Sequence, residues 1–286
     1  NPQARALALR RNFLIGLVHD NPNAQMVLGV QEGILGAIQD TEYALVVRPV
    51  DRRSPDMIKD VRDFLEQQRL AGVLFLPPIS ENNQLAEVCR EIGCRYVRMG
   101  SVTLDDPACS VTSNDRDAVA EATRHLIALG HRRIGFIVGP PGFRSAQERM
   151  LGFEQALSEA GIATSRSMVA DGNYTFDSGR AAADRLLDLS PRPTAIFASN
   201  DEMAAGVLHA AYQRDIKVPE QLSIVGFDDT VTAAHMWPPL TTVRWPIVSM
   251  ARAAALKLIH PHLADKEPAL FVSSLIRRAS VAAVSV

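Results

Sequence analysis

Two short apolar runs, each about as long as a β-strand, lie in the second half of the chain. They span residues 194–198 and 222–225, and each is followed by a small polar or acidic cluster. A stripe of apolar positions at helical spacing, with Asn200 or Asp201 as its cap, lies between them, so the stretch is predicted to be a βαβ unit. In an open parallel sheet, ligands bind beyond the carboxyl ends of the strands, which is where Asn200 and Asp228 would lie. The alternative is that both residues only cap a helix and shape a turn.

The rest of the chain repeats this alternation of strand-like and helix-like segments. Strand-like runs are predicted at residues 13–18, 43–47, 72–76, 96–99, 133–138 and 167–170. Helical periodicity separates them, with one helix predicted from Leu85 to Ile92 and another capped by Ser145. Such alternation is typical of a parallel sheet covered by helices on both faces. With about four strands in each half, the chain is predicted to form two α/β lobes of similar plan.

Residues 241–286 are too few for a third lobe. They contain a strand-like run at 241–245, a helical stretch at about 247–262 and one strand-like run at 270–278. The economical interpretation is that the chain crosses back to complete the first lobe and then returns once more.

Composition limits the function classes. The chain has 286 residues, of which 47% are hydrophobic and 22% charged, a length that suits two globular lobes. A formal net charge of -2 argues against the broad basic surface that nucleic-acid binding needs, so this chain is not expected to bind DNA by itself. Cys89, Cys94 and Cys109 form no paired framework, and no secretory leader or membrane-length apolar run is present; a reducing cytoplasm is expected.

Arg149 is unusual for its position. It falls one turn into the helix that Ser145 is expected to cap, near the predicted carboxyl pole of the strands. The helix dipole disfavours a cation there, so Arg149 is expected to have a specific partner. The alternative is a solvated surface arginine.

Five motifs occur in order: HLIALGHRRIGFIVGPP, SAQERMLGFEQAL, PTAIFASNDEMAAGVL, VPEQLSIVGFDDT and PPLTTVRWP. Together they resemble the effector-binding core of the lactose-repressor type (LacI/GalR family) of bacterial transcriptional regulators, over nearly the whole chain. The resemblance implies an α/β fold with two Rossmann-like lobes of the periplasmic-binding-protein-like type I fold, joined by three crossovers. It also implies a small effector in the interlobe cleft and a homodimer. The N-terminal lobe would comprise residues 12–112 and 245–272, and the C-terminal lobe residues 113–244 and 273–286.

The resemblance also implies a set of ligand-binding residues. The arginine of the SA-x-x-R motif is Arg149, the asparagine of F-A-x-N-D is Asn200, and the first aspartate of G-F-D-D is Asp228. Tyr174 stands where family members place an aromatic ring against the ligand. Guanidinium donors, an amide and a carboxylate suit a polyol, and a ring stacks on the apolar face of a sugar. The expected effector is therefore a mono- or disaccharide.

The chain departs from the family pattern at two places that touch the pocket wall. The first loop reads HDNPNAQ and lacks both aromatic residues that are usual in the family; His19 and Asp20 stand there instead. Trp245 occupies a position usually held by glutamine. All three are candidate ligand contacts. His19 can equally be an ordinary histidine at the end of a strand.

Residues 1–11 are basic and mildly helical, and they resemble the end of the family's hinge helix. The helix-turn-helix headpiece that would precede them is not in this chain, and operator DNA would be bound through it. On this interpretation Leu7 is the apolar wedge for the minor groove and Arg5 faces phosphate. The alternative is an overhang that only happens to be basic.

The leading functional interpretation is a sensor whose lobes change their angle when a sugar binds, which modulates operator binding. The alternative is a periplasmic sugar-binding protein of an uptake system. An enzyme ranks third, because neither Ser/His/Asp nor metal-ligand spacing is present, and no cofactor or metal is expected.

Overall fold

The structure, a computed structural model, describes residues 12–21, 23–263 and 269–284. The chain divides into two compact units. Unit 1 comprises the residues up to 113 together with 246–271, and unit 2 comprises 114–245 together with the residues from 272. The chain therefore passes between the units three times, after Ser113, Trp245 and Phe271.

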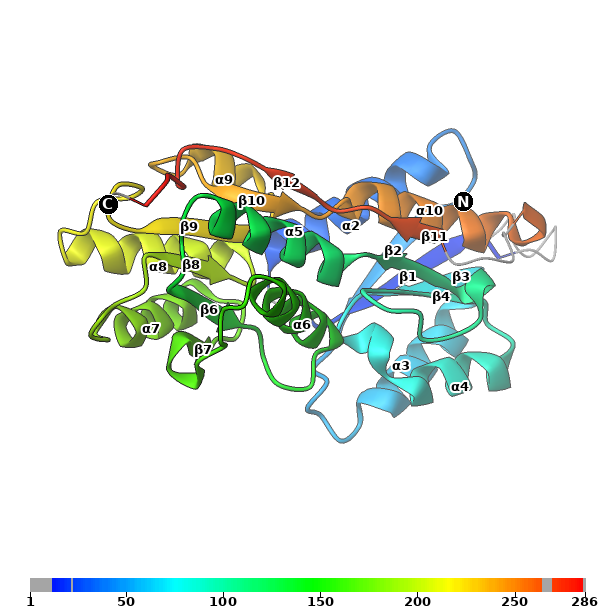
Figure 1. The fold of residues 1–286 in the computed structure, drawn as a ribbon. Coiled ribbons are helices and arrows are strands. Elements are labelled where there is room, and N and C mark those ends of the chain that lie inside the picture. Colours follow the sequence, from blue (N-terminus) through cyan, green and yellow to red (C-terminus); the bar gives the residue numbers. More distant parts are fainter. Residues whose placement is uncertain (1–11, 22, 264–268, 285–286) are drawn as a thin grey trace. The chain divides into compact units, whose positions relative to one another are not determined.

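Unit 1 is a parallel sheet with helices on both faces (Figure 1). Its strand order is β11-β5-β4-β3-β1-β2. The strands are β1 (Leu14–His19), β2 (Ala44–Pro49), β3 (Gly72–Phe75), β4 (Tyr96–Gly100), β5 (Ser110–Ser113) and β11 (Ala269–Phe271). The helices are α2 (Ala24–Ile38) and α10 (Ile247–Ile259), which pack together on one face, and α3 (Met57–Gln68) and α4 (Asn83–Ile92), which cover the other. Every residue of β3 is buried, as a strand covered on both faces requires.

Unit 2 repeats this plan around a second sheet, with strand order β12-β10-β9-β8-β6-β7. Its strands are β6 (Ile134–Val138), β7 (Val169–Asp171), β8 (Ala195–Ala198), β9 (Ser223–Asp228), β10 (Thr241–Arg244) and β12 (Ser274–Ile276), of which β12 pairs antiparallel. Its helices are α5 (Asp115–Ala128), α6 (Arg144–Glu159), α7 (Phe176–Leu187), α8 (Asp201–Gln213) and the short α9 (Val231–His235). Helices α5 and α6 pack as one pair, and α7 and α8 as another (Figure 1).

In the part of the chain that the structure describes, these elements are joined by the 3-10 turns η1 (Ile79–Glu81), η2 (Pro107–Cys109), η3 (Arg166–Met168) and η4 (Pro261–Leu263). No helix in the described part of the chain is both long and apolar enough to cross a membrane.

The predicted α/β class with two mainly parallel sheets is confirmed, and several local predictions were wrong. Within the described residues each sheet has six strands, because the segments after residue 240 add β11 to one sheet and β10 and β12 to the other. The single run predicted at 270–278 is two strands in different sheets, β11 and β12, since the chain passes between the units at that point. Helix α6 begins at Arg144 after the N-cap Phe143, so Ser145 lies inside the helix and does not cap it.

Close contact between α7 and α8 depends on glycine. A Cβ on Gly206 would overlap the carbonyl oxygen of Phe176, and one on Gly179 would overlap the backbone of Met203. The absence of these two side chains lets the helices approach backbone to backbone above the apolar core of unit 2.

Gly206→Ala is therefore expected to destabilise the protein by about 1–3 kcal/mol, because the added methyl group must push two backbones apart. Ser158→Ala near the end of α6 is the control, since Ser158 is an exposed helical residue of the same unit. The better helix propensity of alanine should leave that variant unchanged or more stable by up to about 1 kcal/mol. Urea unfolding of both variants measures the difference, and equal stability of Gly206→Ala and wild type would contradict this packing.

Candidate ligand-binding site

The carboxyl ends of the parallel strands in unit 2 carry a group of buried polar side chains. Strand β8 is followed by Ser199 and Asn200, and β9 ends in Asp228. Helix α6 begins after the loop that follows the neighbouring strand β6, and Arg149 lies in its second turn. The fold therefore brings Arg149, Asn200 and Asp228 to one pole of the same sheet.

Arg149 is a buried cation at the centre of this pole, with 4% of its surface exposed. Its Nε donates to Oδ2 of Asp115 over 3.0 Å, and its Nη1 donates to the carbonyl oxygen of Ser199 over 2.5 Å. The guanidinium lies over the ring of Phe227, 3.6 Å from the ring centroid. Its Nη2 has no hydrogen-bond partner among the described residues. The alternative of a solvated surface arginine is wrong, because Arg149 has the specific partners that its place in the helix predicted.

Asp228 combines burial, backbone strain and an unpaired carboxylate. It is 8% exposed, and its φ of 119° lies in a region that residues with a side chain rarely adopt. Such a conformation costs about 1–3 kcal/mol and occurs most often at functional sites. No hydrogen bond to the carboxylate is made by the described residues. Burial raises the pKa of Asp228 well above its ordinary value, and the charge of Arg149 opposes that rise.

Tyr174 and Asn200 are joined to each other. The Oδ1 of Asn200 accepts from the backbone N–H of Met203 over 2.9 Å, which caps α8, and its Nδ2 donates to the carbonyl oxygen of Tyr174 over 3.1 Å. Tyr174 itself has a left-handed φ of 67°, and its ring centroid lies 5.9 Å from Arg149. Asn200 therefore caps the helix, as one alternative held, and also holds the aromatic residue beside Arg149.

Asp201 is a supporting residue that the sequence reasoning treated only as a possible cap. Its Oδ2 accepts from the backbone N–H and the hydroxyl of Thr230, and its Oδ1 accepts from the hydroxyl of Thr242. Burial raises the pKa of Asp201 to about 6, and these hydrogen bonds oppose the rise. The carboxylate thus ties the loop after Asp228 to the neighbouring strand β10.

Unit 1 has its own polar pole at the end of β1. His19 closes that strand, and Oδ2 of the next residue, Asp20, accepts from Nη1 of Arg52 over 3.0 Å. Burial raises the pKa of Asp20, and the Arg52 charge opposes this; burial lowers the pKa of His19, and Asp20 opposes that.

Five buried polar atoms at this pole have no hydrogen-bond partner in the described part of the chain. They are His19 Nδ1, Asp20 Oδ1, Asn23 Nδ2, Ser80 Oγ after the adjacent strand β3, and Ser101 Oγ after β4. A buried polar atom without a partner costs about 1–3 kcal/mol, so this pole is suited to a ligand that supplies hydrogen-bonding groups. The sequence reasoning missed Asn23, Ser80 and Arg52, although each follows the end of a predicted strand or precedes the next helix.

The remaining predicted residues have different outcomes. Trp245 is buried, and its backbone N–H donates to the carbonyl oxygen of Asp228 over 3.3 Å. Leu7 and Arg5 lie outside the described residues, so their contact with DNA stays a prediction. Asp115 was not among the predicted site residues, although it is the partner of Arg149. No group of three or more His, Cys, Asp or Glu residues in the described ranges could hold a metal ion.

Comparison with known proteins gives one consistent result. A sequence profile for the periplasmic binding protein-like domain matches residues 123–281. The HTH-type transcriptional regulator DegA of Bacillus subtilis (strain 168) is 32% identical over 255 residues, which cover 87% of this chain and 74% of the relative.

Solved structures agree with the sequence relatives. The complex of the transcriptional regulator CelR with cellobiose has a TM-score of 0.85 at 28% identity, covering 97% of this chain and 89% of that one. The lac repressor dimer bound to operator and the anti-inducer ONPF has a TM-score of 0.87 at 25% identity, covering 99% of each chain. These relatives are regulators of transcription, which are not enzymes, and they give the uptake-protein alternative no support. The chain belongs to the LacI family of transcriptional regulators, as its five ordered motifs predicted.

Proposed function

We propose that this chain senses a neutral mono- or disaccharide on behalf of a DNA-binding transcriptional regulator that acts in the cytoplasm. The observation that carries the proposal is the buried, strained and unpaired carboxylate of Asp228 beside the guanidinium of Arg149. A carboxylate in this state gains hydrogen bonds only from a bound molecule that brings its own donors, such as vicinal hydroxyls.

The other groups at the pole of unit 2 fit the same ligand class. Arg149 retains Nη2 as a donor, and Tyr174 offers a ring face to the apolar side of a sugar. Asp115 already balances the charge of Arg149, so Asp228 leaves an uncompensated negative charge at the pole. That charge disfavours an acidic ligand and favours a neutral one. The cellobiose complex of the relative CelR supports a saccharide.

His19, Asp20 and Trp245 are further proposed contacts. At the pole of unit 1, the unpaired Oδ1 of Asp20 is proposed to accept from a sugar hydroxyl, and the unpaired Nδ1 of His19 to form a hydrogen bond with another. Trp245 contributes its indole ring to the pocket wall, and its backbone is already bonded to Asp228.

The function is tested by thermal-shift measurement of the purified chain against a panel that includes cellobiose and ribose. A ligand that binds only the folded state raises the melting temperature. Asp228→Asn should weaken binding of the stabilising sugar by at least about tenfold, or roughly 1.4 kcal/mol, since an amide accepts fewer hydroxyl donors than a carboxylate. The exposed Asp188→Asn in the same unit is the control and should bind as wild type. Wild-type affinity in both Asp228→Asn and Arg149→Ala would eliminate the site.

Sugar affinity is expected to depend on acidity through Asp228. The carboxyl group must be ionised to accept two hydroxyl donors, and its pKa is raised by burial. Protonation on lowering the pH therefore begins well above the ordinary range near 3.8, and affinity should fall with it. Calorimetric titration between about pH 8 and pH 4.5 measures this, and Asp228→Asn should flatten most of the dependence. A wild-type affinity that stays constant over that range would contradict the role of an ionised Asp228.

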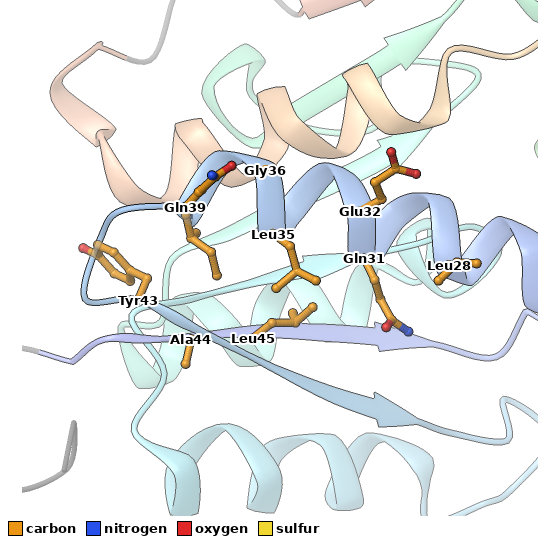
Figure 2. Close-up of a pocket in the computed structure, with 10 residues that line it drawn as sticks. Leu28, Gln31, Glu32, Leu35, Gly36, Gln39, Tyr43, Ala44 and Leu45 are labelled. Atoms are coloured by element: carbon orange, nitrogen blue, oxygen red, sulfur yellow. The ribbon is translucent and has the colours of Figure 1, made fainter.

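We further propose that the chain forms a homodimer through the α2 and β2 edge of unit 1. Leu28 and Leu35 on the outer side of α2 are 65% and 51% exposed, which is unusual for large apolar side chains. They lie with Tyr43 and Leu45 around a hollow beside strand β2, at the edge of the sheet (Figure 2). Burial against a second copy would remove both the apolar surface and the open strand edge from water. The solved relative with operator is a dimer, which supports this assignment.

Leu35→Arg is expected to shift the protein toward monomer, because a guanidinium on an apolar contact must be desolvated without a partner. Leu270→Arg is the matched control: Leu270 is also exposed, but it lies on β11 at the opposite edge of the same sheet. Light scattering at micromolar concentration should show a dimer for wild type and Leu270→Arg. A dimer for Leu35→Arg would place the contact elsewhere.

A further inference from the structure

Asp229, the residue after the proposed ligand carboxylate, binds two arginines at once. Its Oδ1 accepts from Nη2 of Arg278 and its Oδ2 accepts from Nε of Arg244, each over 2.6 Å. The Asp229 side chain is 5% exposed. A buried carboxylate with both oxygens paired is costly to disturb, because loss of either arginine leaves one buried oxygen without its hydrogen-bond donor.

The two arginines lie close to places where the chain passes between the units. Arg244 directly precedes Trp245, the residue after which the chain leaves unit 2. Arg278 follows β12, the short strand with which the chain re-enters unit 2 after Phe271. Both segments are therefore tied to the residue next to Asp228 by a charged hydrogen bond.

The remaining passage is tied to the same pole through other residues. The Oδ1 of Asn114 accepts from the backbone N–H of Ser273 over 2.8 Å, so the first and third passages are bonded to each other inside unit 2. The residue after Asn114 is Asp115, the partner of Arg149. The residues at each connection between the units are thus linked to a proposed ligand-binding residue by one or two hydrogen bonds together with a peptide bond.

The backbone conformation at Asp228 and Asp229 also favours coupling between the ligand carboxylate and the connecting segments. Asp228 and Asp229 both have positive φ, 119° and 56°, so the chain turns sharply where the ligand carboxylate stands. The arginine pairs of Asp229, with the hydrogen bonds of Asp201 to Thr230, hold this strained turn in place. A ligand that pulls on the Asp228 carboxylate therefore acts on a turn whose next residue is anchored to both passages.

We infer that Asp229 is a positioning residue that couples the ligand carboxylate of Asp228 to two of the three connections between the units. The inference rests on the proposed function, since it assigns a route by which sugar binding reaches the connecting segments. Asp229 does not touch the sugar in this scheme, because both of its carboxylate oxygens are committed to arginines. Its effect is on how binding is transmitted.

The coupling is tested first without any ligand. Hydrogen exchange followed by mass spectrometry reports on the two connecting segments, residues 244–248 and 272–278. Asp229→Asn should speed exchange in both segments by at least about fivefold, because the uncharged amide has only one acceptor oxygen for the two arginine donors. Asp184→Asn is the matched control, since Asp184 also pairs with two arginines of unit 2, Arg180 and Arg214, but on α7. Faster exchange in only one segment, or in neither, overturns the inference.

A second arm separates transmission from simple stabilisation. Cellobiose and ribose are added singly to wild type, Asp229→Asn and Asp184→Asn, at concentrations that saturate each protein by calorimetry. In wild type and Asp184→Asn, the bound sugar should slow exchange in both connecting segments; in Asp229→Asn it should still bind, with the slowing reduced at least about fivefold. A merely structural role would not alter this ligand-dependent difference at equal occupancy. Full slowing in the saturated Asp229→Asn variant overturns the inference.

A double-mutant cycle supplies an independent readout. Because Arg278 ties only residues 272–278 to Asp229, Arg278→Gln should reproduce the faster exchange of Asp229→Asn in that segment alone, and the double variant should add little there to the effect of Asp229→Asn. Additive effects would show that the two residues act separately and would overturn the scheme. Failure of both sugars to bind wild type would count against the proposed function, while the ligand-free arm and this cycle would still decide the role of Asp229.

Discussion

The buried guanidinium of Arg149 constrains the whole carboxyl pole of unit 2. A cation this far from water is tolerated only when it is paired and hydrogen-bonded. Its partners come from three distant parts of the chain: Asp115 at the start of α5, Ser199 after β8, and Phe227 within β9. The ends of these elements must therefore meet at one place, and Asp228, which ends β9, lies close enough there for its carboxyl group to interact with the charge of Arg149.

Much of the fold could be predicted because hydrophobic period and capping residues act locally. The helix predicted at Leu85–Ile92 is α4, and Gly93 ends it with a left-handed φ of 69°, a conformation that glycine adopts without strain. The run at 270–278 was mispredicted for a non-local reason: it has strand-like apolar residues in both β11 and β12, and nothing within it shows that the chain changes sheets at residues 271–272. Ser145 misled because a good capping residue one position inside the helix looks the same in sequence as one at its start.

At the candidate site, the residues could be predicted from the sequence, but their partners could not. Position at the end of a strand pointed to Asn200 and Asp228, and an unfavourable helix dipole pointed to a partner for Arg149. The identity of that partner was not predictable, because Asp115 lies 34 residues away and only the packing of α5 against α6 brings them together. Asp229 was also passed over, since a pair of adjacent acids in a turn does not reveal that one is held by two arginines and the other is left unpaired.

The different partners of four carboxylates at the pole of unit 2 support the proposal that its ligand is a neutral polyhydroxyl molecule. Three of these carboxylates are bonded within the protein. The carboxylate of Asp115 accepts from Arg149, that of Asp201 from two threonines, and that of Asp229 from two arginines. Asp228 alone among these four has an unpaired carboxylate. A phosphate or carboxylate ligand would add a second negative charge beside Asp228, and the charge of Arg149 is already balanced by Asp115. Hydroxyl groups meet the carboxylate as donors and the remaining guanidinium N–H as acceptors, so a sugar satisfies both without adding charge.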